Sequence, residues 1–225
     1  MRASLFVAAT ALVVCVAGAS AQTRPPARPQ PPPPPARGLA VRGYGEAGIH
    51  WFAASKTFDA VLGSSSGPIF GGGAEALWNR KLSISFDVSR FQATGERVFV
   101  FNDEVFPLGI ETSIDIVPIA INVAYRLERP RSSVTPFVGG GVNWHHYSET
   151  SDFAADGEDV SATYTGIHAL GGAEWRVSRY VAVGGVARWM SVRDALGAEP
   201  TSAANAFDEH DLGGFDVRVR IVVGR

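Results

Sequence analysis

Cysteine is almost absent from this sequence of 225 residues, which contains only one. Cys15 lies in an apolar run, Leu5 to Ala17, that follows a basic start and precedes the Ala-x-Ala pattern of residues 19–21. These features indicate a secretory signal peptide at residues 1–21, and the run is too short to cross a bilayer as a helix. Once the signal is removed, the chain has no disulfide and no thiol chemistry.

An excess of one charge is also lacking, because 20 Lys and Arg residues face 22 Asp and Glu residues, for a net charge of −2. This balance argues against nucleic acid as a partner. His50, His145 and His168 lie on separate segments without a known metal-ligand spacing, and the glycines around Gly71 lack the lysine of a phosphate loop. We therefore expect no metal and no cofactor.

Proline is present but unevenly placed, since most of the 14 prolines lie between residues 23 and 38. Arg24, Arg28 and Arg37 are interspersed with them. A segment of this composition cannot pack a core and should form extended polyproline II. We interpret residues 22–39 as a periplasmic linker that acts as a stiff spacer. The alternative is a docking peptide for a periplasmic or cell-wall partner.

From residue 40 onwards, apolar and polar residues alternate with a period of two. Residues 82–89 read LSISFDVS, and residues 215–223 read FDVRVRIVV. Along a strand, this period places one row of side chains on each face of the sheet. One row here is apolar and the other is charged or small, which is the pattern of a barrel whose outer face meets lipid.

The connections between the alternating segments are short and long in turn. The segments are 41–51, 70–78, 82–89, 114–125, 138–145, 167–177, 181–189 and 215–223. The short connections are Asn79–Lys81, Glu128–Ser133 and Ser178–Arg179, and the long ones are Ala53–Gly67, Gln92–Ile110, Ser148–Ala162 and Asp194–His210. This order predicts an all-β fold over residues 40–225: a monomeric, eight-stranded, antiparallel up-and-down transmembrane β-barrel with both chain ends on the short-turn side.

The segment at 114–125 departs from strict alternation. Ile114 and Ile116 are expected to face outward at even positions, and after a shift of one residue Ile119 and the apolar residues that follow face outward at odd positions. We expect a β-bulge next to Pro118, which would account for both the phase shift and the missing backbone donor.

The inward row carries basic and acidic side chains in balance. In a narrow eight-stranded lumen these charges must be paired, because an isolated charge away from water is strongly unfavourable. We expect a salt-bridged plug that fixes the barrel and conducts poorly, and a small gated pore whose pairs rearrange is the alternative. The predicted lumen network consists of Arg42, Glu46, Glu75, Asp87, Asp115, Arg126, Glu174, Arg176, Arg188, Asp216, Arg218 and Arg220.

The tryptophans fall near the ends of the alternating segments, in the apolar row. Amphipathic rings at two levels are typical of an aromatic girdle at the two membrane–water interfaces. The predicted girdle consists of Trp51, Trp144 and Trp189 at the outer rim and of Trp78, Tyr125, Trp175 and Tyr180 at the inner rim.

Four segments carry a resemblance to a known family: DIVPIAINVAYRL, TPFVGGGVNW, GIHALGGAEWRVS and DLGGFDVRVRIVV. They resemble the repeating hairpins of the OmpA/OmpX/OmpW-type outer-membrane β-barrel domain family, across residues 40–225. The resemblance implies a porin-like eight-stranded barrel in a Gram-negative outer membrane, in contact with outer-membrane lipid and lipopolysaccharide. It also implies a non-catalytic role in envelope structure, surface interaction or small-solute passage.

Two other functions remain open at this point. A soluble periplasmic carrier of an apolar ligand, as in lipocalins, would need an apolar lumen and a polar exterior. A lipid A deacylase-like hydrolase is suggested by His146 and Ser148, with Glu149 or Glu158 as the carboxylate, because a serine beside a histidine can attack an acyl ester. Glu149 stands where that enzyme family has asparagine, and we expect these residues to be polar rim residues.

Overall fold

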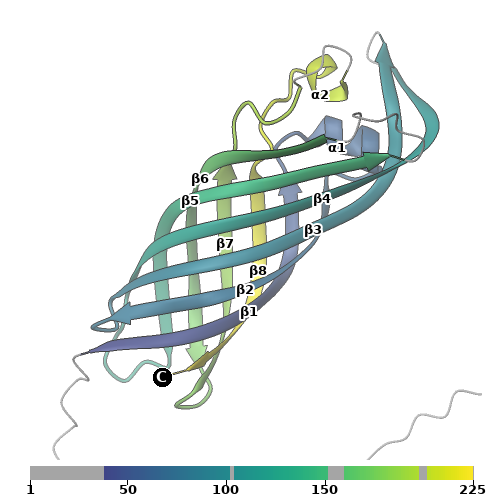
Figure 1. Cartoon of the computed structure of the whole chain (residues 1–225). Coiled ribbons are helices and arrows are strands. Elements are labelled where there is room, and N and C mark those ends of the chain that lie inside the picture. Colours follow the sequence, from purple (N-terminus) through teal and green to yellow (C-terminus); the bar gives the residue numbers. More distant parts are fainter. Residues whose placement is uncertain (1–37, 102–103, 152–159, 198–201, 225) are drawn as a thin grey trace, which may run out of the picture. The chain divides into compact units, whose positions relative to one another are not determined.

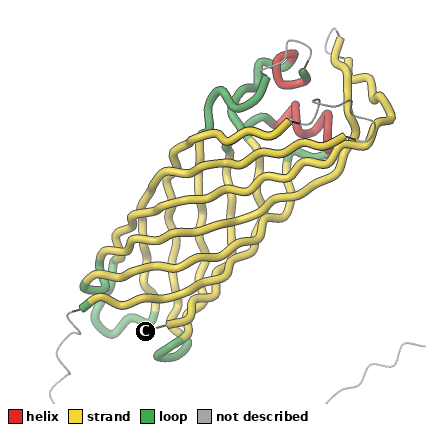
Figure 2. Tube along the Cα trace, viewed as in Figure 1, coloured by secondary structure: helices red, strands yellow, loops and turns green. Residues whose placement is uncertain are grey.

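The computed structural model describes residues 38–101, 104–151, 160–197 and 202–224. The predicted signal peptide and the proline-rich segment up to residue 37 lie outside these residues. In the described part, eight strands form a closed barrel in which every strand is antiparallel to its neighbours (Figures 1 and 2). This confirms the predicted fold class.

The strands follow one another around the barrel in sequence order. They are β1 Leu39–Phe52, β2 Ser66–Trp78, β3 Leu82–Phe101, β4 Glu104–Arg126, β5 Val134–Ser151, β6 Val160–Arg176, β7 Val181–Ser191 and β8 Gly214–Gly224. Two short helices, α1 Ser55–Leu62 and α2 Ala203–Ala206, lie in the connections β1–β2 and β7–β8.

The barrel closes between its first and last strands. β1 pairs with β8 from Arg42 opposite Gly224 to Phe52 opposite Gly214. The inward-facing Gly48 makes this closure possible, because a Cβ there would lie 2.0 Å from the carbonyl oxygen of Val217. The up-and-down order of the eight strands places the start of β1 and the end of β8 at the same end of the barrel, which also carries the short turns.

The two rows of side chains face as the alternation predicts. Phe86 is 50 % exposed on the outer surface while its neighbour Asp87 is 1 % exposed in the lumen, and Val217 at 45 % alternates with Arg218 at 1 %. An outer surface of large apolar side chains is stable only against hydrocarbon, whereas water would favour the reverse arrangement.

The β2–β3 turn shows why the short connections can be so tight. Asn79 and Arg80 both adopt positive φ, at 48° and 58°. Two consecutive left-handed residues form the type I′ turn, whose twist matches that of the flanking strands. Lys81 closes this turn by donating its backbone N–H to the carbonyl of Trp78 at 3.1 Å.

The predicted bulge at Pro118 is wrong. β4 keeps a single register with β3 across this residue, and the register shifts only between Glu96 and Val98. Ile114 and Ile116 therefore face inward, not outward, and both are buried. The expected facing fails because the lumen changes from polar to apolar towards this end, while the outward row of β4 carries the polar residues Ser113 and Asp115.

The predicted loop Gln92–Ile110 is also wrong in its secondary structure. β3 continues to Phe101 and β4 starts at Glu104, so most of this segment is a two-stranded hairpin that extends beyond the barrel wall (Figure 1). Cross-strand pairs such as Phe99 opposite Phe106 continue the ladder and favour this extension.

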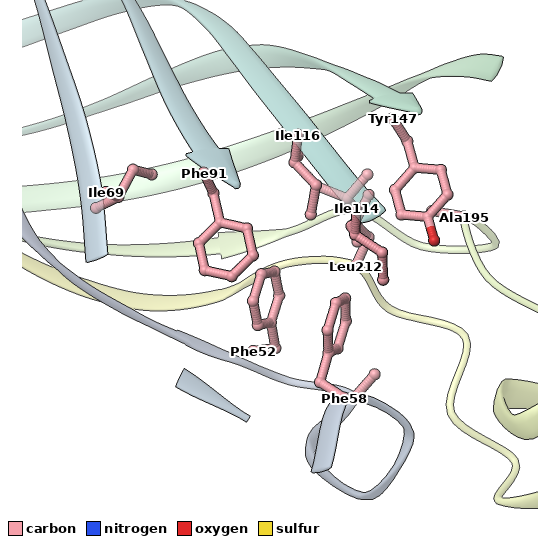
Figure 3. Packing of buried hydrophobic residues seen from close by; sticks show 11 residues of the cluster. Phe52, Phe58, Ile69, Phe91, Ile114, Ile116, Tyr147, Ala195 and Leu212 are labelled. Carbon is pink, nitrogen blue, oxygen red and sulfur yellow. The ribbon is translucent and has the colours of Figure 1, made fainter. Parts of the chain in front are cut away.

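An apolar cap covers the lumen at the end with the long connections. Phe58 of α1 stacks on Phe52 of β1 with ring centroids 3.7 Å apart, and Phe91 meets the Phe52 ring edge-on at 4.9 Å (Figure 3). Neither described helix is long and apolar enough to cross a membrane. The buried residues of the cap are Phe52, Ala54, Phe58, Ile69, Phe91, Ile114, Ile116, Tyr147, Val192, Ala195 and Leu212.

The connection between β7 and β8 holds α1 in place. The carboxylate of Glu209 accepts from the backbone N–H groups of Lys56 and Thr57 at 3.2 and 2.8 Å, and from the Thr57 hydroxyl at 2.9 Å. Free N–H groups in the first turn of a helix favour an anionic acceptor. Ala54 at the N-cap position offers no side-chain acceptor, so Glu209 supplies this cap from a distant part of the chain.

Replacing Phe58 should open the cap without unfolding the barrel. Phe58→Ala removes the aromatic stack, and a buried Phe→Ala change costs about 3–5 kcal/mol. We expect faster amide hydrogen exchange over residues 55–63 and an unchanged heat-dependent gel shift of the barrel. Asp59→Ala, at an exposed position of the same helix, is the matched control and should leave exchange unaltered. Equal exchange in both variants would contradict this account of the cap.

The β7–β8 connection should weaken as the pH rises. The carbonyl of Leu196 accepts from Nδ1 of His210 at 3.0 Å and Asp208 lies 3.2 Å from Nε2, and these contacts raise the pKa of His210 above its usual value. The contribution to stability is therefore complete below about pH 6.5 and is lost as the pH rises through the raised pKa. The Ala195 amide, which donates to the His210 carbonyl, should exchange faster at high pH after correction for intrinsic rates. His210→Gln should abolish this dependence.

Candidate functional site

The side chains that face the lumen form layers along the barrel axis, and β1 contributes a side chain to each layer. From the short-turn end to the cap, its inward side chains are Arg42, Tyr44, Glu46, His50 and Phe52. Side chains from the other strands gather at each level, so the lumen runs from ionic through aromatic, ionic and histidine-containing layers to the apolar cap.

The first layer, which we call the short-turn layer, consists of Arg42, Glu75, Arg126 and Glu174. Glu174 accepts from Arg126 through both carboxylate oxygens, at 3.1 and 2.6 Å, and from Arg42 at 3.0 Å. Arg42 also pairs with Glu75. These contacts join β1, β2, β4 and β6 across the lumen.

The second ionic layer, the central layer, is formed around Glu46. Arg218 donates to Glu46 at 2.8 Å and to both oxygens of Asp216 at 2.9 and 2.7 Å. Arg220 donates to the other oxygen of Glu46 at 3.1 Å. The side chains of Arg218, Glu46 and Asp216 are 0 % exposed. Arg188 and Asp87 complete the central layer.

Asp87 connects the central layer to the opposite wall of the barrel. Arg188 donates to its two oxygens, each at 3.3 Å. Asn122 donates to the same carboxylate at 2.7 Å, and the Tyr44 hydroxyl does so at 3.3 Å. Because transferring each ion out of water costs several kcal/mol, such pairs are tolerated only when their remaining donors and acceptors are also satisfied.

An aromatic level separates the two ionic layers. The Arg220 guanidinium lies 4.0 Å from the centroid of the Tyr44 ring and 5.8 Å from that of Phe137, and Arg126 lies 6.0 Å from Phe137 on the other side. Cations at these distances are attracted to the ring faces. Tyr44 and Phe137 are missing from the predicted site, although both occupy the inward phase of their strands and could have been found from it.

The next level, the histidine layer, contains His50, His145, His168, Asn122 and Asn143. His168 Nε2 lies 2.6 Å from the Asn122 carbonyl oxygen, and Nδ1 lies 3.4 Å from the amide nitrogen of Asn143. Neither ring nitrogen of the buried His145 has a hydrogen-bond partner among the described residues. No group of His, Cys, Asp and Glu side chains in the described part of the chain is arranged to hold a metal ion.

Two members of the predicted lumen network lie elsewhere. Asp115 faces outward because β4 has no bulge at Pro118, and it accepts from exposed Arg90 at 2.9 and 2.5 Å. Arg176 is the last residue of β6 and lies at the open rim, where its side chain is 54 % exposed and pairs with Glu128 at 3.4 Å. The prediction that these two side chains face a closed lumen is therefore wrong.

The predicted girdle residues all face away from the lumen, but they do not all lie near strand ends, because Trp144 lies in the interior of β5 and Tyr180 just before β7. Trp51 and Trp189 flank Phe215, with Trp51 opposite it on β1 and Trp189 opposite it on β7. The ring centroids of Trp51 and Phe215 are 6.2 Å apart, so the outward-facing Phe215 lies among these aromatic residues although it is not one of the predicted girdle residues. That the rings mark the membrane interfaces remains a prediction for Trp51, Trp78, Tyr125, Trp144, Trp175, Tyr180 and Trp189.

Among the described residues of the hydrolase hypothesis, His146 and Glu149 form hydrogen bonds with other residues and not with one another. His146 and Ser148 both face away from the lumen, as predicted. However, His146 Nδ1 lies 3.2 Å from the Thr163 hydroxyl, and Glu149 accepts from the Tyr147 hydroxyl at 2.7 Å. Glu158 lies outside the described residues. Within the described part of the chain, no hydrogen bond connects His146 to Ser148.

A closed barrel with an apolar exterior and an ionic lumen defines an integral membrane β-barrel protein. The family model for the outer membrane protein beta-barrel domain matches residues 7–218, and the chain belongs to this family. It is an outer-membrane protein. No protein of curated function matches the sequence.

Solved structures with a similar fold come from several bacteria. A major outer membrane protein from Thermus thermophilus matches with a TM-score of 0.52 at 11% identity, over 82% of this chain and 99% of that chain. The N-terminal β-barrel domain of Pseudomonas aeruginosa OprF matches with 0.49 at 8%, over 82% and 97%. Neisserial surface protein A matches with 0.49 at 15%, over 83% and 97%. Identities this low show similarity of fold alone.

Removing one cation from the central layer should strongly destabilise the barrel. Arg218→Met leaves Glu46 and Asp216 without their main partner, and breaking a buried pair in this way costs about 3–5 kcal/mol. Urea unfolding of the protein refolded into vesicles measures this loss. Arg176→Met, at the exposed rim, is the matched control and should change the unfolding free energy by less than about 0.5 kcal/mol. Similar losses in both variants would show that the central layer is not a special source of stability.

Proposed function

We propose that this protein is a non-catalytic, closed β-barrel that anchors its surface connections and its proline-rich segment to the outer membrane. The observation that carries this proposal is the double closure of the lumen. The central layer fills the lumen with paired ions, and the cap covers one end with apolar side chains.

The two closures block different kinds of solute. An ion crossing the central layer would have to displace pairs such as Arg218–Glu46, whose side chains have no exposure to solvent. A polar solute crossing the cap would lose its hydration among Phe52, Phe58 and Phe91 without a polar partner. Closure at both levels supports a structural role over general diffusion.

The proposed assembly is a monomer that contacts outer-membrane lipid and lipopolysaccharide. Its wall has no free strand edge, because β1 pairs with β8, so no second copy is needed to satisfy backbone groups inside the membrane. The proline-rich segment then serves as a spacer, and capture of a periplasmic or cell-wall partner by that segment is its alternative role.

The carrier hypothesis is wrong, since an apolar ligand requires an apolar lumen. Here Asp87, Arg188 and Arg218 face the axis, while Phe86 and Val217 face outward. The hydrolase hypothesis loses support, because Thr163 and not Ser148 contacts His146. Ser148→Ala should therefore leave the lipid composition of the host membrane unchanged.

Slow passage of small solutes is the second candidate, and the histidine layer favours it. Both ring nitrogens of His145 and the side-chain oxygen of Asn143 are buried without a hydrogen-bond partner among the described residues. Unpaired buried groups cost about 1–3 kcal/mol each, so this level is suited to hold water or a small polar solute. The cap is the barrier between this level and the outside.

Planar-bilayer recording of the refolded protein separates the two candidates. We expect no resolved unitary conductance for the wild type or for Phe58→Ala, because the central layer still blocks the lumen when the cap is loosened. Brief openings in the wild type that become more frequent in Phe58→Ala would favour solute passage and overturn the closed anchor. Asp59→Ala, refolded and recorded in the same way, is again the matched control variant.

A further inference from the structure

The short-turn end of the barrel carries a surplus of exposed basic side chains. The turns β2–β3, β4–β5 and β6–β7 contain a single acidic residue, Glu128. Every basic residue of these turns is exposed to solvent. We call these residues, with the neighbouring Arg176, the basic collar: Arg80, Lys81, Arg129, Arg131, Arg176 and Arg179.

The basic collar lies directly beyond the outward aromatic residues of the same end. Trp78 precedes the β2–β3 turn, and Trp175 precedes Arg176. The Arg179 guanidinium lies 4.8 Å from the centroid of the Tyr180 ring. Aromatic rings are typical of the level at which hydrocarbon gives way to headgroups, and the girdle prediction would place the cations beside them at the headgroup phosphates.

The opposite end has the reverse chemistry. Between β7 and β8, the described residues include Asp194, Asp208, Glu209 and Asp211 but only one arginine, Arg193. The ionisable side chains of the described β3–β4 hairpin near this end are Glu96, Glu104 and Glu111, against a single arginine, Arg97. The charge of the two ends therefore differs in sign, although the whole chain is nearly neutral.

We propose that the basic collar binds the headgroups of anionic phospholipids in the leaflet that faces the periplasm. Guanidinium groups bind phosphate oxygens in pairs, and basic residues next to a membrane surface strengthen its attraction for anionic lipid. This inference depends on the outer-membrane assignment and goes beyond the proposed function, since it names a ligand for an end of the barrel that the closed lumen does not use.

The distribution of the basic collar favours separate lipid molecules over one large ligand. Its members come from three turns that are spaced around the circumference of the barrel. A ring of headgroups can meet all three turns at once, whereas an acidic polymer lying across the rim would meet only part of them. The sequence before β1 adds Arg24, Arg28 and Arg37 and no acidic residue between positions 23 and 38, so the basic chemistry continues along the chain.

Lipid retention by the full-length mature chain tests the proposal. The protein is refolded into vesicles of phosphatidylcholine with phosphatidylglycerol, extracted gently and examined by native mass spectrometry for the lipids that remain bound. We expect the wild type to retain phosphatidylglycerol preferentially, and added salt to weaken this preference. Arg80→Gln with Lys81→Gln should lower the preference about fivefold for each charge removed.

A matched control removes two cations from the other end. Lys56→Gln with Arg193→Gln alters exposed residues on the cap side and should leave the lipid preference unchanged. Arg129→Gln with Arg131→Gln repeats the test on a second turn, in case the first variant does not fold by its heat-dependent gel shift. Loss of preference in the cap-side control, or its persistence in both collar variants, would overturn the proposal.

Two further arms identify the ligand and its relation to the lumen. Wild type in detergent is sedimented with purified peptidoglycan, and binding there without any preference for phosphatidylglycerol would assign the basic collar to the cell wall instead. Conductance of the collar variants should equal that of the wild type. A collar variant that shows no conductance but has lost its preference for phosphatidylglycerol would support the lipid site independently of the lumen. Conductance of the wild type would contradict only the proposed function.

Discussion

The pairing of Glu46 with Arg218 is the interaction on which the rest of this barrel depends. A wall that presents Phe86, Val88 and Val217 to lipid must turn every intervening polar side chain towards the axis. The ions collected there are stable only if they neutralise one another, because burial of a single charge is strongly unfavourable. The apolar exterior and the ionic lumen are thus two results of one alternation in the sequence.

Layering follows from the same alternation. Each strand contributes one inward side chain for every two residues, so a residue's place along its strand fixes its level in the lumen. Two ionic layers, the aromatic level of Tyr44 and Phe137 between them, and the apolar cap then close the lumen by different means. The proposed role as an anchor depends on the expectation that paired ions exclude ions and that packed rings exclude polar solutes.

Period-two alternation was sufficient to predict the number of strands, the order of the strands around the barrel, and whether most charged side chains face the lumen. It failed at Ile114, Ile116 and Asp115, where the lumen becomes apolar and the outward row of β4 is polar, so that the two rows exchange their chemistry. It failed at Arg176 because facing does not say where the wall ends. The contacts of α1 with Glu209 join residues 152 or more positions apart, and no local pattern reports them. The ten remaining residues of the predicted network, twelve minus Asp115 and Arg176, lie in the two ionic layers.

The sequence distance between Glu46 and its partners has a consequence for how this chain is made. Arg218 and Arg220 stand 172 and 174 positions after Glu46, on the final strand. Until β8 is synthesised, the Glu46 carboxylate on β1 lacks its arginine partners on β8. A hairpin that contains β1 would therefore carry an unpaired charge into the hydrocarbon if it inserted alone. Contacts this remote are slow to form. Insertion should therefore be concerted, with the early strands entering the membrane only together with the last one.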